Sequence, residues 1–146
     1  MTLSTFGAIM GFASEMVKHS LTTYQTIVQR AKDTVFKEHL QGLLGEKEKE
    51  IALMEQTRRE NVTEMILEPI TGLHQGDYEF EVEIPDQAKD LDLLKIVLIF
   101  EKREQKFFQD SSQKVPLPEV ARIFRKVAHK KEKNLTKLKS LGLNQP

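Results

Sequence analysis

The sequence has 146 residues, of which 39% are hydrophobic and 30% are charged, and this composition predicts a single folded domain, residues 1–146, with a sizeable core. Its 22 Lys and Arg residues balance its 22 Asp and Glu residues, so we expect neither a nucleic acid nor a membrane as partner. The absence of cysteine excludes disulfide bonds, cysteine nucleophiles and iron–sulfur centres held by this chain. No apolar run reaches the length of a membrane span and no signal peptide is recognisable, so a cytoplasmic protein is expected.

The first predicted helix spans about residues 4–31, with Ser4 or Thr5 as its N-cap. Apolar residues recur along it at intervals of three and four, which is typical of a helix with one buried face. Val17 lies at the middle of this face.

The second predicted helix spans about residues 34–66, with Asp33 or Thr34 as its N-cap. Its apolar stripe carries an unusual residue, because Glu48 lies at the edge of the stripe just before Ile51. A carboxylate next to a core needs a hydrogen-bond or charge partner.

The helical pattern of the sequence stops at about residues 67–88, where proline and glycine break any helix. Apolar and acidic residues alternate near its middle, which indicates an extended segment with one apolar side. Because two helices precede it and two follow it, we expect a long crossover between helices 2 and 3 of a four-helix bundle. The apolar side would pack along the outside of the bundle or, alternatively, pair across a dimer axis; its residues are Tyr78, Phe80, Val82 and Ile84.

The third predicted helix spans about residues 89–111 and places Glu101 at the centre of its apolar stripe, with Glu104 at the margin. A proline-containing turn follows it. These are two further acidic residues on a face that should be buried.

The fourth predicted helix spans about residues 118–141, and Pro118 fits its first position. Lys131 and Asn134 lie at the centre of its apolar face. Each of the last three helices therefore carries polar residues near the middle of its core stripe.

The two halves of the sequence repeat this arrangement. Position 17 precedes Glu48 by 31 residues, and Glu101 precedes Lys131 by 30. Di-iron carboxylate bundles have this layout, in which two helices each supply one Glu and the other two each supply a Glu and a His three residues apart. The pairs that correspond here are Glu48 with Ile51 and Lys131 with Asn134.

Three stretches resemble the rubrerythrin branch of the ferritin-like superfamily over nearly the whole chain. AKDTVFKEHLQGLLGEKEKEIALM resembles the second helix of that family, FEKREQKFF the third and FRKVAHKKEKNLTKL the fourth. The resemblance implies an all-α, ferritin-like four-helix bundle with a long crossover, and a homodimer. It also implies that Glu48 and Glu101 retain metal-ligand positions and that Glu104 occupies an accessory one, so these three are the remnant ligand candidates.

Four ligand positions of the family are replaced in this chain. Val17 stands at the helix 1 Glu, Ile51 at the helix 2 His, and Lys131 and Asn134 at the helix 4 Glu and His. Iron prefers oxygen and imidazole donors, and a lysine adds a positive charge where metal cations would lie. We therefore predict that the Lys131 ammonium group replaces the metals, and we expect no bound metal or cofactor.

Two other arrangements remain open at this point. Lys131 could extend to solvent while Glu48 turns outward. Alternatively, Glu48, Glu101 and Glu104 could hold a single metal ion.

The functional prediction is a binding or structural module with a degenerate di-iron site, no catalytic residue and a protein partner that the sequence does not identify. The alternative is a non-haem iron oxidoreductase that reduces peroxide or oxygen through a partial carboxylate site. Having no cysteine, it would depend on an external electron donor. A third possibility is sequestration of a metal or small molecule in the bundle core.

Overall fold

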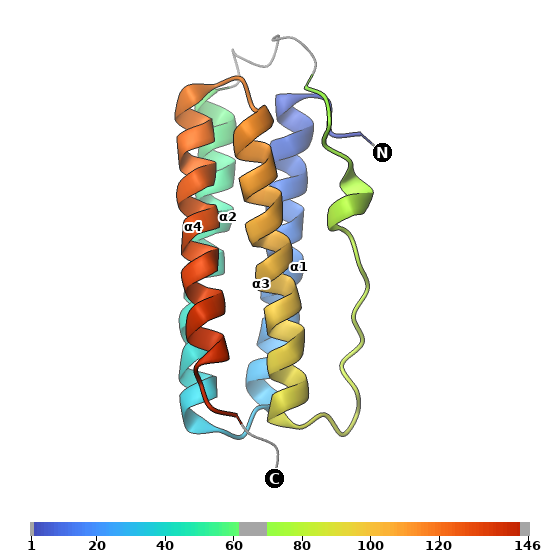
Figure 1. The fold of residues 1–146 in the computed structure, drawn as a ribbon, viewed down its shortest axis with the longest axis vertical. Coiled ribbons are helices and arrows are strands. Elements are labelled where there is room, and N and C mark those ends of the chain that lie inside the picture. The colour runs from blue at the N-terminus through green and yellow to red at the C-terminus, as the bar shows by residue number, and fades with distance from the viewer. Residues whose placement is uncertain (1, 62–69, 144–146) are drawn as a thin grey trace.

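The computed structural model describes residues 2–61 and 70–143, and these residues form an all-α four-helix bundle (Figure 1). Within these ranges there are four α-helices and one short 3₁₀ helix. They are α1 (Phe6–Arg30), α2 (Thr34–Glu60), η2 (Gln75–Tyr78), α3 (Asp90–Lys114) and α4 (Pro118–Lys139).

Side chains fix where the helices begin. The Thr5 hydroxyl accepts a hydrogen bond from the Ala8 backbone N–H at 3.0 Å, and the Asp33 carboxylate accepts one from the Phe36 N–H at 2.9 Å. Each bond satisfies a donor that the first turn of a helix leaves free. Both residues were among the predicted N-caps, and Pro118 is the first residue of α4 as predicted.

The helix ends differ from prediction by a few residues. α2 ends at Glu60, and the rest of its predicted extension, residues 62–66, lies outside the described residues. α3 continues three residues past 111 to Lys114, because Ser111 and Ser112 are still buried against the core. α4 ends at Lys139, two residues before the predicted end.

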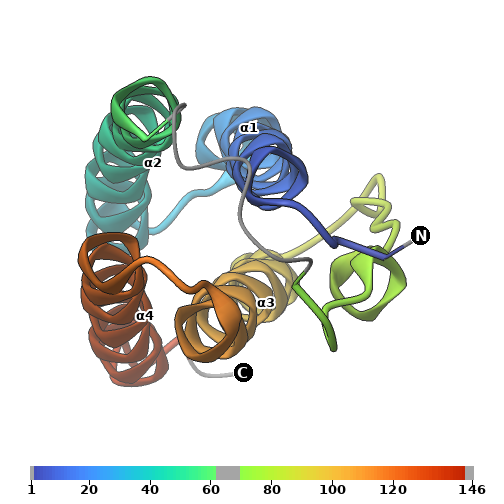
Figure 2. The same ribbon diagram turned by 90° about the horizontal axis from the view of Figure 1, so that it is seen from above.

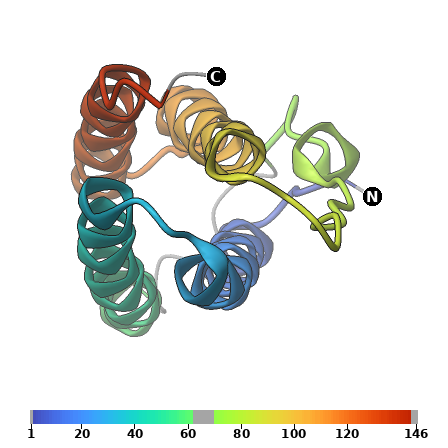
Figure 3. The ribbon, with the colours of Figure 1, turned by 90° about the horizontal axis from the view of Figure 1, so that it is seen from below.

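The helices form two antiparallel hairpins, α1–α2 and α3–α4, that lie side by side (Figures 2 and 3). In this arrangement α1 is next to α3 and α2 is next to α4. The chain colours show that α2 and α3 run in the same direction (Figure 1). No described helix combines the length and the apolar composition needed to cross a membrane.

Residues 70–89 run along the length of the bundle beside α1 and α3 (Figure 1). Phe80, Val82 and Ile84 are half-buried against the core, while the glutamates between them are exposed. The prediction that the apolar side packs on the outside of the helices is confirmed. Backbone hydrogen bonds tie the start of this segment to the N-terminus, including Leu3 N–H to Leu73 O at 2.8 Å.

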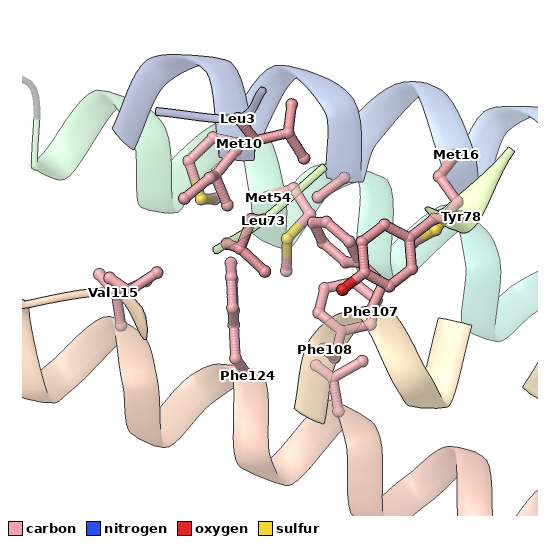
Figure 4. Packing of buried hydrophobic residues seen from close by; sticks show 14 of the residues in the cluster. Leu3, Met10, Met16, Met54, Leu73, Tyr78, Phe107, Phe108, Val115 and Phe124 are labelled. Carbon is pink, nitrogen blue, oxygen red and sulfur yellow. The ribbon is translucent and has the colours of Figure 1, made fainter. Parts of the chain in front are cut away.

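The apolar core is divided into two clusters. The first lies where α1 and α4 begin, and Figure 4 shows Met54, Phe107, Phe108 and Phe124 reaching into it. The second lies at the opposite end of the bundle and is built from the last half of α1, the first halves of α2 and α3, and Leu138. The residues between the two clusters are polar.

Candidate functional site

A layer of polar side chains separates the two apolar clusters. In α2 it lies between Leu43 and Met54, and in α4 between Ala128 and Leu138. All four helices contribute, and we call the set the core polar cluster. It consists of Ser20 and Tyr24 of α1, Glu46, Lys47 and Glu50 of α2, Glu101 and Glu104 of α3, and Lys131 and Asn134 of α4.

Lys131 is fully buried and its ammonium group is surrounded by carboxylates. Its Nζ lies 2.6 Å from each oxygen of Glu50, 3.0 Å from Oε1 of Glu46 and 3.2 Å from Oε1 of Glu104. Burial on its own lowers the pKa of a lysine, but the surrounding glutamates outweigh it and hold the pKa of Lys131 well above its ordinary value. Lys131 is therefore an ammonium ion inside the bundle and does not extend to solvent.

Lys47 is a second buried ammonium group, which the sequence analysis did not anticipate. Its Nζ contacts Oε2 of Glu101 and lies 2.6 Å from Oε1 of Glu104. It also lies 5.2 Å from the centroid of the Tyr24 ring, within the range of a cation–π contact. Both lysines are thus neutralised by carboxylates of neighbouring helices.

Neutral donors satisfy the remaining oxygens. The Tyr24 hydroxyl donates to Oε2 of Glu101 at 2.7 Å, and Ser20 Oγ donates to Glu104. Asn134 Nδ2 donates both to Oε1 of Glu101 at 3.0 Å and to Oε1 of Glu46 at 2.9 Å. Buried carboxylates are stable only when their oxygens are paired in this way.

The environment of each carboxyl group sets its charge. Burial raises the pKa of Glu101, but Lys47 and Lys131 outweigh it and lower the pKa to about 2. For Glu50 burial is the larger effect, and it raises the pKa to about 7 despite Lys131. The pKa of Glu46 is lowered, because Lys131 and the hydrogen bonds it accepts offset its partial burial.

With all four glutamates ionised, the two lysines leave the cluster two negative charges in excess. A proton on Glu50 reduces the excess to one. The guanidinium group of Arg103, bonded to Ser20 Oγ at 3.0 Å, supplies a third positive charge close by. The protonated form of Glu50 therefore brings the region to electrical balance.

The predicted position of Glu48 is wrong, because Glu48 is exposed to solvent. The inward face of α2 contains Lys47 and Glu50, one residue earlier than the predicted pair of Glu48 and Ile51. The register was assigned from the apolar residues Leu44 and Ile51, which are only partly buried at the edges of the two clusters. The fully buried Lys47 takes the site position on α2 that was predicted for Glu48.

The other predicted site residues lie on the buried helix faces that the apolar stripes predicted. Glu101, Glu104 and Lys131 are fully buried and Asn134 is half-buried, and the fold brings all four together. Val17 is fully buried in the first apolar cluster, one turn from Ser20. The residues that sequence reasoning missed are Ser20, Glu46, Lys47 and Glu50.

One signal in the sequence marks the correct register of α2. Lys47 follows Val17 by 30 residues (47 minus 17), and Lys131 follows Glu101 by the same 30 (131 minus 101). The repeat between the halves is therefore exact when Lys47 and not Glu48 is matched with Lys131.

The side chains present do not fit a di-iron centre. Among the described residues, no group of three or more His, Cys, Asp or Glu is placed to hold a metal ion. The oxygens of Glu50, Glu101 and Glu104 are instead directed at the two ammonium groups, and the cluster contains no imidazole. Ligand oxygens engaged with two fixed cations are a poor site for further cations.

A surface groove of about 380 Å³ between α2 and α4 reaches the edge of the cluster. Glu46 and Asn134 are among the residues that line it, and the Glu46 side chain is 11% exposed. Solvent therefore meets the cluster at the α2–α4 side of the bundle.

No family model, curated protein or solved structure matches this chain.

Proposed function

We propose that this chain is a ferritin-like, rubrerythrin-type bundle in which two buried lysine ammonium groups replace the metal ions, and that it acts as a binding or structural module. The observation that supports this proposal is the pairing of Lys47 and Lys131 with four glutamates between the two apolar clusters. Each ammonium group supplies one positive charge where a metal ion would supply two or more.

The arrangement of the chain favours the ferritin-like part of the proposal. α2 and α3 run in the same direction (Figure 1). Residues 70–89 extend along the bundle from the level at which α2 ends to the level at which α3 begins. A four-helix bundle with one long crossover has these features. The long crossover, the homodimer and the cytoplasmic location are parts of the same proposal.

A structural role follows from where the bonds of the cluster run. Lys47 of α2 pairs with Glu101 and Glu104 of α3, and Lys131 of α4 pairs with Glu46 and Glu50 of α2. These ion pairs connect one helical hairpin to the other. Ser20 and Tyr24 of α1 make the same connection to α3 through hydrogen bonds. The cluster thus fixes how the two hairpins dock.

The protonation state of Lys131 also argues against catalysis by this residue. A lysine acts as a nucleophile or base only when its pKa is lowered. The pKa of Lys131 is instead held well above its ordinary value by Glu104, Glu101, Glu50 and Glu46, against the effect of burial. Its lone pair is therefore unavailable, and its charge serves to neutralise the carboxylates.

The test is the metal content of the purified protein, measured before and after anaerobic incubation with ferrous iron. We expect iron far below one equivalent per chain, because the ligand oxygens are already occupied. A Glu104→Gln variant is the matched control, since iron that binds equally to both proteins is bound at the surface. One or more equivalents of iron in the unaltered chain, lost in Glu104→Gln, would overturn the proposal. Peroxidase assays with an added electron donor would then follow.

A further inference from the structure

A second site lies on the opposite side of α1 from α2. It is a groove of about 510 Å³ between α1 and residues 75–80, with α3 beneath it. This volume is within the range of small-molecule binding sites. Its walls are largely apolar, and the residues that matter below are Phe12, Met16, His19, Tyr78, Phe80 and Arg103.

Arg103 lines this groove and is only 8% exposed. Its Nη2 donates to the Met16 carbonyl oxygen at 3.2 Å and to Ser20 Oγ at 3.0 Å, and its Nη1 lies 3.3 Å from Nδ1 of His19. Among the residues that the structure describes, its Nε has no hydrogen-bond partner, and this atom is itself buried. The guanidinium group also packs over the rings of Phe80 and Phe100, at 4.5 and 4.8 Å from their centroids.

All of these hydrogen-bond partners are neutral. Within residues 2–61 and 70–143, no carboxylate forms a direct ion pair with Arg103, and Glu104 is connected to it only through Ser20. Within the described residues, Glu104 and Glu101 act on the charge of Arg103 only from a distance, and no anion is bonded to its guanidinium group. Because Arg103 lines the groove and is not engaged in a direct ion pair, it can donate to an anionic group that the groove admits.

His19 provides a second donor at the same place. A guanidinium group can only donate hydrogen bonds, so Nδ1 of His19 accepts and the ring proton is on Nε2. His19 is an exposed residue. Burial of part of its ring and the charge of Arg103 together lower the pKa of His19, which favours this neutral form. An anion in the groove would thus find Arg103 and His19 adjacent.

We propose that this groove binds a small monocarboxylate with an apolar body, independently of the role of the core polar cluster. The carboxylate group would be held by Arg103 and His19, and the apolar body would lie along Phe12, Met16 and Phe80. A single negative charge fits best, because the exposed residues Glu15 and Glu79 also line the groove and would repel a second negative charge.

The experiment is isothermal titration calorimetry of the full chain with octanoate, with 1-octanol as the uncharged ligand of the same chain length. We expect octanoate to bind and octanol to bind at least about tenfold more weakly, since the loss of a charged hydrogen bond has that effect. Arg103→Gln should weaken octanoate binding by a similar factor. Absence of octanoate binding, or equal binding of octanol, would overturn the proposal.

Two glycines supply matched variants that keep the fold. Gly11 lines this groove and Gly42 lines the groove between α2 and α4, both in the interior of helices. A Cβ atom built on either meets nothing within 4 Å among the described residues, so a side chain can start there without a clash, and leucine has a higher helix propensity than glycine. Gly11→Leu should abolish octanoate binding by filling the groove, whereas Gly42→Leu should leave it unchanged. Unchanged binding by Gly11→Leu would place the ligand elsewhere and refute the assignment.

Discussion

Lys47 and Lys131 share one carboxylate oxygen, because Oε1 of Glu104 lies 2.6 Å from Nζ of the first and 3.2 Å from Nζ of the second. Glu101 flanks Lys47 on its other side, and Glu50 flanks Lys131. The five side chains form a row of alternating charge across the bundle. Each member is stabilised by its neighbours, so removal of one leaves the neighbouring charges buried without a partner.

Lys131→Ala should lower the free energy of unfolding by about 3 to 5 kcal/mol, as is typical when one partner of a buried ion pair is removed. The physical reason is that Glu50 and Glu46 would stay buried without their ammonium partner. Urea denaturation followed by far-ultraviolet circular dichroism measures the change.

The adjacent Lys130 is the matched control for this variant. Its side chain is 56% exposed and its Nζ lies 4.0 Å from Glu46. An exposed pair at this distance contributes little, so Lys130→Ala should change stability by no more than about 0.5 kcal/mol. Equal urea midpoints for the two alanine variants would mean that Lys131 makes no stabilising ion pairs.

Removal of both charges of the Lys131–Glu50 pair should cost less than the sum of the single changes. Lys131→Met retains the aliphatic stem, and at about pH 8, above the pKa of Glu50, Glu50→Gln removes the charge that the lysine neutralises. We expect a favourable coupling of about 1 to 3 kcal/mol in the double-mutant cycle, which is the range for residues in direct contact. The cycle is measured by urea denaturation of the four proteins. Strict additivity would show that Glu50 and Lys131 do not interact energetically.

The four helices and their first residues could be predicted because these features are local. The spacing of apolar residues and caps such as Thr5 and Asp33 depend only on nearby sequence. The alternating segment was also predictable in part, because Phe80, Val82 and Ile84 show which side faces the core. Its backbone forms no strand within the described residues, since the helices beside it offer no strand edge for pairing.

The register of the site in α2 was harder to predict, because charged residues are ordinarily assigned to solvent. Leu44 and Ile51 therefore outweighed Lys47 in the choice of the buried face. The burial of Lys47 depends on Glu101 and Glu104, which are more than 50 residues away in the sequence. Only the equal 30-residue separations in the two halves carried that information within the sequence.

Stability should fall as the pH rises from about 5 to 8, owing to Glu50. The pKa of its carboxyl group is about 7 in the folded chain against 4.5 for an ordinary Glu, so the folded state binds the proton more tightly. The stabilisation by this proton is complete below about pH 4.5 and is lost as the pH passes through about 7. At about 1.4 kcal/mol per pKa unit, we expect a decrease of about 2 to 3 kcal/mol.

Glu50→Gln is the control for this pH dependence, because glutamine resembles the protonated acid and does not titrate. Unfolding free energies of both proteins are measured by urea denaturation from pH 5 to 8, and their difference isolates Glu50. Glu101 acts in a separate window, since its pKa of about 2 makes stability fall only on acidification below about 4.5. The lowered pKa of His19 gives the opposite slope but is common to both proteins. Parallel curves would refute the pKa assignment for Glu50.

A chain in which the replaced positions carry metal ligands again should bind iron. The structure defines the changes as Val17→Glu, Lys47→Glu, Glu50→His, Lys131→Glu and Asn134→His, with Glu101 and Glu104 retained. Without metal this variant would bury several carboxylates without cations, so we expect it to be largely unfolded. Ferrous iron added anaerobically should restore helicity, since metal binding and folding are coupled in such sites.

The matched control uses the α2 register that was predicted from the sequence, in which Glu48 and position 51 are the ligand positions. It carries Val17→Glu, Ile51→His, Lys131→Glu and Asn134→His, and it leaves Lys47 as a buried cation. Because Lys47 still occupies Glu101 and Glu104, and because Glu48 is exposed, this control should take up less iron and recover less helicity. Circular dichroism and bound iron are measured on both variants at matched concentration. Equal iron uptake by the two variants would show that the inward face of α2 does not determine the metal site, which would remove the basis for treating Lys47 and Lys131 as the replacements for metal ions.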